Sequence, residues 1–198
     1  GLIADRFFSA QKVMGFLNIL GGVILYFLSQ TKDPEIFFWY ILAYTMCFAP
    51  NLALSNSIAM NQMQNPEKEF PAIRVTGTIA WIVVTNIIGF LALGDNVAIF
   101  QIAMFSSFAL GIYAFFLPDT PPKADKNASV SQIIGLDALQ LFKDRSFLIF
   151  FISSILICIP LSFYYAMANP SLTDSHMTNV ENKMSLGQAS EVIFMLLK

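Results

Sequence analysis

The class of this fold is decided by one run of seven bulky apolar and aromatic residues, Ile36-Phe37-Phe38-Trp39-Tyr40-Ile41-Leu42. In lipid, every backbone N–H and C=O group needs a partner within the protein, so only helices and closed barrels cross a membrane. Strands of a membrane barrel alternate apolar and polar residues over about ten positions. This run does not alternate, and it therefore indicates a membrane-spanning helix.

Six long apolar windows account for 125 of the 198 residues but hold only three charges, Arg74, Glu191 and Lys198. A helix needs roughly 20 predominantly apolar residues, within a range of about 17–25, to cross the hydrocarbon core. The first five windows meet that length and the sixth ends with the chain. We predict an all-α, polytopic membrane protein with spans at residues 13–29, 36–60, 71–93, 97–118, 146–168 and 184–198.

The composition excludes several other classes of protein. The chain is 56% hydrophobic and 12% charged, whereas soluble domains carry about 25% charged residues. This balance rules out a disordered chain, a basic nucleic-acid binder and most soluble enzymes. An intramembrane enzyme or a receptor is disfavoured, because the spans contain neither His nor Asp. His176 stands in a loop without clustered ligands, and Cys47 and Cys158 lie in apolar spans, so we expect no enzyme activity, cofactor, metal or disulfide.

Basic residues are distributed unequally between the two sides of the membrane. Loops alternate in side along a polytopic chain, and cytoplasmic loops carry an excess of Lys and Arg. Segments 1–12, 61–70 and 119–145 hold seven basic residues, while 31–35, 94–96 and 169–183 hold two, Lys32 and Lys183. We therefore place the first set in the cytoplasm and the protein in the cell (inner) membrane.

The long segment 119–145 is the candidate boundary between two parts of the chain. It begins with Asp119-Thr120-Pro121-Pro122 and then becomes amphipathic, with apolar residues at helical spacing at Ile133, Leu136, Leu139 and Phe142. Such a helix lies along a membrane surface. We predict four spans within residues 1–118, a cytoplasmic linker with a surface helix at 119–145, and two further spans at 146–198.

One helix face of the third span combines a cation, a hydroxyl and an aromatic ring. Arg74, Thr78 and Trp81 follow one another at positions i, i+4 and i+7. Ionisable groups are costly at membrane depth, and a planar cation with a ring suits a polar ligand that contains a flat ring. The alternative is a packing stripe in which Arg74 reaches the lipid headgroups.

The last window carries a carboxylate, Glu191, followed by six apolar residues and preceded three positions earlier by Gln188. A carboxylate at that depth must pair, bind a cation or take up a proton, because burial favours its neutral form. A proton-accepting carboxylate is what a proton-coupled transporter requires. The alternative is a structural ion pair between helices, with Arg74 as the obvious partner.

These motifs together resemble a known family. Residues Gly1-Leu2-Ile3-Ala4-Asp5-Arg6 look like the G-x-x-x-D-R loop of the major facilitator superfamily. Within it, Glu69-Phe70-Pro71-Ala72-Ile73-Arg74-Val75-Thr76-Gly77-Thr78-Ile79 is similar to the D-F-P-P-I-R-x-x-G-T-I stretch of the bacterial nucleoside–proton symporters. Gln188-Ala189-Ser190-Glu191 resembles their Q-x-S-E. The surface helix from Ile134 to Lys143 also looks like theirs.

The resemblance implies that the chain covers about helices three to eight of a twelve-helix fold. It also implies that Arg74, Thr78 and Trp81 face a central nucleoside site, to which Gln188 and Glu191 contribute from the other half. Where the family places a substrate-contacting Gln and Asn on the seventh helix, an ungapped alignment gives Ser162 and Tyr165. Tyr164 is equally plausible if the alignment shifts by one residue.

The resulting hypothesis is a secondary transporter that imports a nucleoside with protons by alternating access. Its partners would be the nucleoside, protons and the lipid bilayer, with no nucleic acid, and we expect a monomer. Glu191 would couple to the proton. The alternative within transport is the same fold carrying a sugar or another small metabolite.

Overall fold

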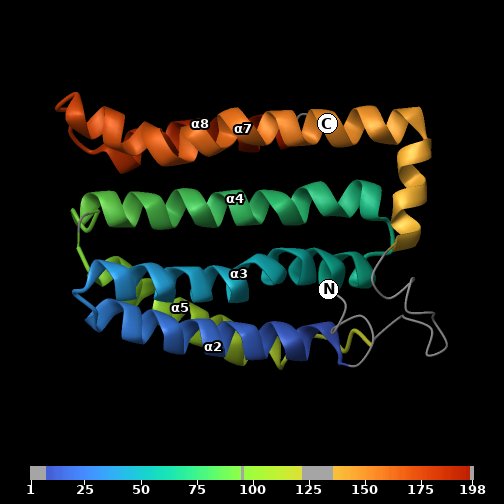
Figure 1. Ribbon diagram of the computed structural model, residues 1–198, viewed down its shortest axis with the longest axis horizontal. Helices are drawn as coiled ribbons and strands as arrows, with labels where there is room; N and C mark the ends of the chain where they lie inside the picture. Colours follow the sequence, from blue (N-terminus) through green and yellow to red (C-terminus); the bar gives the residue numbers. More distant parts are fainter. Residues whose placement is uncertain (1–7, 95, 122–135, 197–198) are drawn as a thin grey trace.

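The computed structural model describes residues 8–94, 96–121 and 136–196 and is helical throughout its regular elements (Figure 1). The elements follow one another as α2 (Ala10–Gln30), α3 (Pro34–Gln62), α4 (Pro66–Phe90), α5 (Ala98–Ala114), the 3₁₀ helix η1 (Leu136–Lys143), α7 (Arg145–Asp174) and α8 (Val180–Leu196). Within these described residues there is no strand, so the predicted all-α class is confirmed.

Helix starts follow from polar caps in the sequence. The carboxylate of Asp33 accepts hydrogen bonds from the backbone N–H of Glu35 at 2.8 Å and of Ile36 at 3.4 Å, and Pro34 occupies the first turn of α3. Asp144 caps α7 in the same way through the N–H of Ser146 at 2.7 Å. Such side chains satisfy N–H groups that have no partner within the helix.

Helices α2, α3 and α5 pack together around small residues. A Cβ atom added to Gly111 of α5 would lie 3.1 Å from the carbonyl oxygen of Gly15 in α2 and 2.8 Å from the Ile19 side chain. The two backbones therefore touch, as small residues permit between helices in lipid. The adjoining core contains Ala10, Met14, Leu54, Ile58 and Ala114.

Helix α4 makes its main contacts with α8 rather than with the helices that precede it. Val75, Thr78 and Gly89 are the buried residues of α4. Helix α7 contacts η1 and α8 and buries none of its own residues. The assignment of residues 1–118 and 146–198 to two bundles stays a prediction, and the structure adds that α4 and α8 bring these two segments together.

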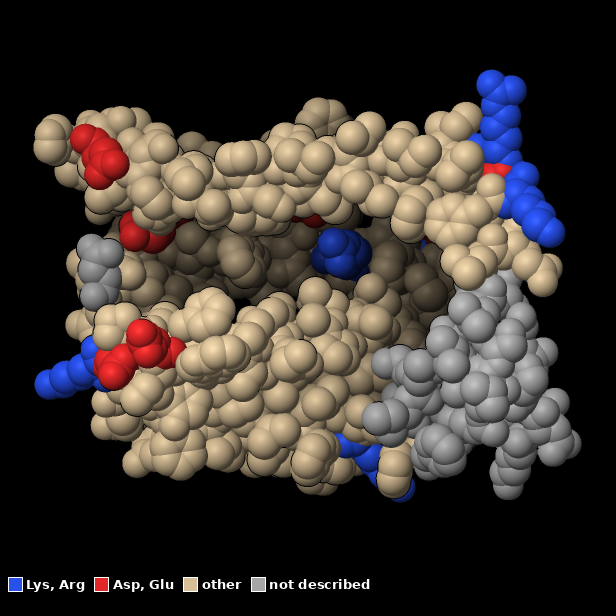
Figure 2. Space-filling model, in the orientation of Figure 1, with Lys and Arg blue, Asp and Glu red and all other residues tan. Residues whose placement is uncertain are grey.

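The apolar lengths agree with a multi-pass membrane protein. Helices α2, α3, α4 and α7 are long and apolar enough to cross a membrane, and α5 is a shorter apolar helix of 17 residues. Figure 2 shows charged atoms mostly at the two ends of the helices, with an uncharged surface between them. The same face is hollowed between its two layers, and both basic and acidic atoms lie inside the hollow.

Helix boundaries differ from the predicted spans, most clearly at the end of α7. Residues 169–183 were predicted to be an outer loop, but α7 continues to Asp174 and α8 begins at Val180. The hydroxyl groups of Thr173 and Ser175 donate to the carbonyls of Asn169 and Ser171, at 3.0 Å and 2.8 Å, so these polar side chains find their partners within the same segment. The loop predicted at residues 61–70 is likewise shorter in the structure, because α4 begins at Pro66 and contains Pro71.

The segment 119–145 is described only in part. Helix η1 crosses the ends of the long helices at a steep angle before α7 begins (Figure 1). Ile133 and the G-x-x-x-D-R motif at residues 1–6 lie outside the described residues. Asp119 is tied to the start of α2, since the Gln11 amide donates to its carboxylate at 2.5 Å. That bond, with another from Ser9, lowers the pKa of Asp119 below its ordinary value.

Candidate functional site

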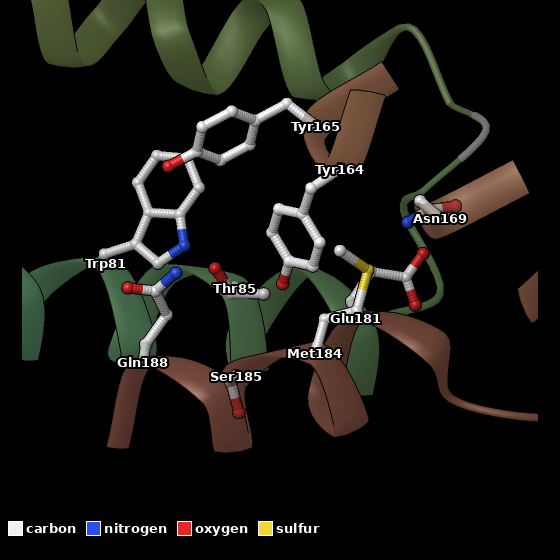
Figure 3. A pocket seen from close by; sticks show the side chains of 9 residues that line it. All are labelled: Trp81, Thr85, Tyr164, Tyr165, Asn169, Glu181, Met184, Ser185 and Gln188. Atoms are coloured by element: carbon white, nitrogen blue, oxygen red, sulfur yellow. The ribbon is translucent and has the colours of Figure 1, made fainter. Parts of the chain in front are cut away.

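A cavity of about 160 Å³ lies between α4, α7 and α8 (Figure 3). Three helices line it with aromatic, hydroxyl, amide and carboxylate groups. The lining residues are Trp81 and Thr85 of α4, Tyr164, Tyr165 and Asn169 of α7, and Glu181, Met184, Ser185 and Gln188 of α8.

The cavity has two chemically distinct ends. Figure 3 shows the rings of Trp81 and Tyr165 close together at one end, with the Gln188 amide beneath Trp81. At the other end, the Glu181 carboxylate lies near the Asn169 amide. The aromatic end offers flat faces for a ring, and the other end offers hydrogen-bonding groups.

Three of the residues predicted from the sequence line this cavity: Trp81, Tyr165 and Gln188. Tyr164, the alternative to Tyr165 in the sequence alignment, also lines the cavity. The two rings meet edge to face, with centroids 5.5 Å apart. The Tyr164 hydroxyl lies near Gly187 of α8, 3.9 Å from where a Cβ would be.

Arg74 and Glu191 do not line the cavity, and both are exposed. Each lies on the same helix face as a residue that lines the cavity. Arg74 precedes Trp81 by two turns, and Glu191 follows Gln188 by one turn. Both charged residues are thus displaced toward the same end of the antiparallel pair α4 and α8. No ion pair joins them.

Thr78 and Ser162 are likewise outside the cavity lining. Thr78 is 8% exposed and belongs to the buried side of α4. Ser162 is exposed, and its hydroxyl donates to the carbonyl of Cys158 one turn earlier at 2.7 Å. Neither residue is among those that line the cavity.

Behind the cavity, α4 and α8 are joined by polar side chains. The Asn182 side-chain amide donates to the Asn86 side-chain oxygen at 2.7 Å, and the Asn86 side-chain amide donates to the Ser185 hydroxyl at 3.0 Å. The Asn182 side-chain oxygen is buried without a hydrogen-bond partner. It lies against Gly89, where a Cβ would overlap it.

The sequence reasoning missed five lining residues: Thr85, Asn169, Glu181, Met184 and Ser185. Their helical spacing was available, since Ser185, Met184 and Glu181 precede Gln188 by three, four and seven positions. Asn169 and Glu181 were overlooked because they were counted as loop residues. Among the described residues, no group of three or more His, Cys, Asp or Glu side chains is placed to hold a metal.

Comparison with known proteins gives consistent matches over the whole chain. A family model described as nucleoside H+ symporter matches residues 1–198. The chain is 44% identical over 203 residues to the putative nucleoside transporter YegT of Escherichia coli (strain K12), covering 99% of this chain and 48% of that protein. It is 33% identical to the xanthosine permease of the same organism, covering 88% of this chain and 43% of that protein.

A solved structure also matches. The crystal structure of a mutant of the nucleoside transporter NupG superposes with a TM-score of 0.81 at 29% identity, covering 99% of this chain and 52% of that chain. The chain thus spans about half the length of the relatives it matches.

Proposed function

The chain belongs to the nucleoside H+ symporter family, and from that premise we propose that the whole protein imports nucleosides together with protons. Transport would proceed by alternating access around a site between two halves. The observation that carries this proposal is the cavity itself, in which Trp81 and Tyr165 supply aromatic faces and Gln188 supplies an amide.

We propose that the nucleoside lies partly in the cavity and partly toward Arg74 and Glu191. The guanidinium of Arg74 suits the polar atoms of the substrate, because it is planar and carries five donors. Glu191 would accept the coupled proton. Thr78 and Ser162 stay candidate substrate contacts from the sequence, which would require a different conformation of the site.

The membrane arrangement is part of the same proposal. Residues 1–12, 61–70 and 119–145 would face the cytoplasm across the cell (inner) membrane, by the excess of basic residues in these segments. Residues 1–118 and 146–198 would belong to two bundles that move relative to each other, and α4 and α8 would meet at their interface. A monomer suffices for this mechanism.

The decisive experiment is uptake of labelled uridine and adenosine by the full-length protein in cells or proteoliposomes. We expect uptake to depend on an inward proton gradient. Unlabelled nucleosides should reduce the uptake of the labelled ones by competition, and sugars should not. If sugars reduce the uptake and unlabelled nucleosides do not, the result would instead support a transporter of sugars or other small metabolites.

The proton role is tested with Glu191→Gln, with Glu67→Gln as a matched control at an exposed position in the first turn of α4. We expect Glu191→Gln to abolish the dependence of uptake on the proton gradient, and Glu67→Gln to leave it intact. Proton-dependent uptake that survives Glu191→Gln would remove Glu191 from the coupling role.

A further inference from the structure

The volume of the cavity limits what it can hold. A cavity of about 150 Å³ lined by apolar side chains holds one benzene molecule, and this cavity measures about 160 Å³. A nucleoside consists of two groups of roughly that size, a base and a ribose. The cavity therefore matches one of the two in volume, and the other would extend beyond its open side.

The aromatic side chains that line the cavity favour the base over the ribose. The rings of Trp81, Tyr164 and Tyr165 surround the cavity from α4 and α7. Every base has a flat π-face that stacks on aromatic side chains, and each stacked base contributes about 1–3 kcal/mol to binding. A ribose has no such face and carries several hydroxyl groups, so it suits the open side of the cavity.

Glu181 places a carboxylate at the end of the cavity opposite Trp81 (Figure 3). Its side chain is partly buried, and it has no hydrogen bond or ion pair with any residue in the described ranges. One carboxylate oxygen packs against Gly94, at a place that a Cβ would occupy. An ionised carboxylate accepts hydrogen bonds and donates none.

We propose that Glu181 is a specificity-determining residue that reads the edge of the base. An acceptor-only group at that edge favours bases with an exocyclic amino group, as a Glu accepts from the amino group of cytosine in nucleic-acid recognition. A base that presents a carbonyl oxygen at the same position meets a second acceptor and is disfavoured. This inference rests on the proposed nucleoside transport.

A purely structural role for Glu181 is the competing explanation. An acidic residue in the first turn of a helix interacts favourably with the helix dipole, and Glu181 lies in the first turn of α8. That role affects the stability of the protein but not the ratio between two substrates of equal shape. Cytidine and uridine form such a pair of nearly equal shape: cytidine carries an amino group at C4 beside an unprotonated N3, whereas uridine carries an oxygen at C4 beside an N3–H.

The test is the ratio of cytidine to uridine uptake at low substrate concentration by the full-length protein. We expect the unmodified protein to favour cytidine and Glu181→Gln to lower the ratio by about tenfold, since a hydrogen bond to a charged group is lost and the new amide also donates. Glu35→Gln, at an exposed position in the first turn of α3, should leave the ratio unchanged.

The outcomes separate the two proposals. If neither nucleoside is taken up by the unmodified protein, nucleoside transport itself is wrong. If both are taken up without preference for cytidine, or if Glu181→Gln leaves the ratio unchanged, the role of Glu181 is overturned. Should the Gln variant fail to reach the membrane, Glu181→Asp keeps the charge but shortens the side chain, and the same fall in ratio is expected.

Discussion

Asn182 of α8 donates a hydrogen bond of 2.7 Å to the side-chain oxygen of Asn86 in α4, a residue 96 positions earlier in the sequence, and so joins the two helices. The side-chain amide of Asn86 in turn donates to the Ser185 hydroxyl of α8 at 3.0 Å. Amide and hydroxyl side chains hydrogen-bond between membrane helices in this way. The cluster holds together the two helices that carry Trp81, Glu181 and Gln188.

Removing one member of this cluster should weaken the contact between α4 and α8. Asn182→Ala leaves the Asn86 oxygen without its donor, at a cost of about 1–3 kcal/mol. We expect a lower midpoint of thermal unfolding for the purified full-length protein. Asn61→Ala is the control, because Asn61 is also partly buried but donates only to Ser57 of its own helix. An equal effect of both substitutions would mean that the link between helices adds no stability.

The contact between α2 and α5 should be sensitive to a single methyl group. In Gly111→Ala the added Cβ would lie 2.8 Å from Ile19 and 3.1 Å from the Gly15 carbonyl, and such overpacking costs about 1–3 kcal/mol. We expect lower thermal stability. Gly77→Ala is the matched control, since a Cβ at Gly77 has no neighbour within 4 Å. A protein whose stability is unaffected by Gly111→Ala would contradict the close approach of α2 and α5.

The link between Asp119 and the start of α2 should depend on pH. The Gln11 and Ser9 hydrogen bonds lower the pKa of Asp119. Its stabilising effect is therefore fully present above the ordinary pKa of an aspartate and is lost as the pH falls through the lowered value. We expect Asp119→Asn to reduce thermal stability near neutral pH and to converge with the unmodified protein in acid. A difference that stays constant down to acid pH would show that the charge of Asp119 contributes nothing.

The membrane-spanning helices were predictable from the sequence because apolar length alone determines which segments can cross a bilayer. Their ends were not, as α7 illustrates. Polarity shows where a chain leaves the lipid, whereas a helix ends where its backbone hydrogen bonds end. Asn169 and Thr173 are polar enough to end a span, yet the helix continues past both of them to Asp174.

Part of the lining of the candidate site was predictable where the sequence carried an unusual residue. Trp81 and Gln188 were found by helical spacing from Arg74 and Glu191, and both line the cavity. Glu181 was not found, because it was assigned to a loop and its helical spacing from Gln188 alone does not place it beside α4. That proximity arises from the packing of α4 on α8, in which the side chains of Asn182 and Glu181 occupy the space that a Cβ at Gly89 or Gly94 would fill.

The stacking role of Trp81 gives a final prediction about transport. Base stacking on an aromatic side chain contributes about 1–3 kcal/mol, so Trp81→Ala should raise the KM for nucleoside uptake by about tenfold. Trp81→Phe keeps a ring and should retain most of the affinity. Trp39→Ala is the control, since Trp39 is 65% exposed on α3, much like Trp81 at 60%, but does not line the cavity. Trp81→Ala and Trp39→Ala should therefore differ in KM although both remove an exposed indole. If their KM values agree, the aromatic end of the cavity does not hold the base.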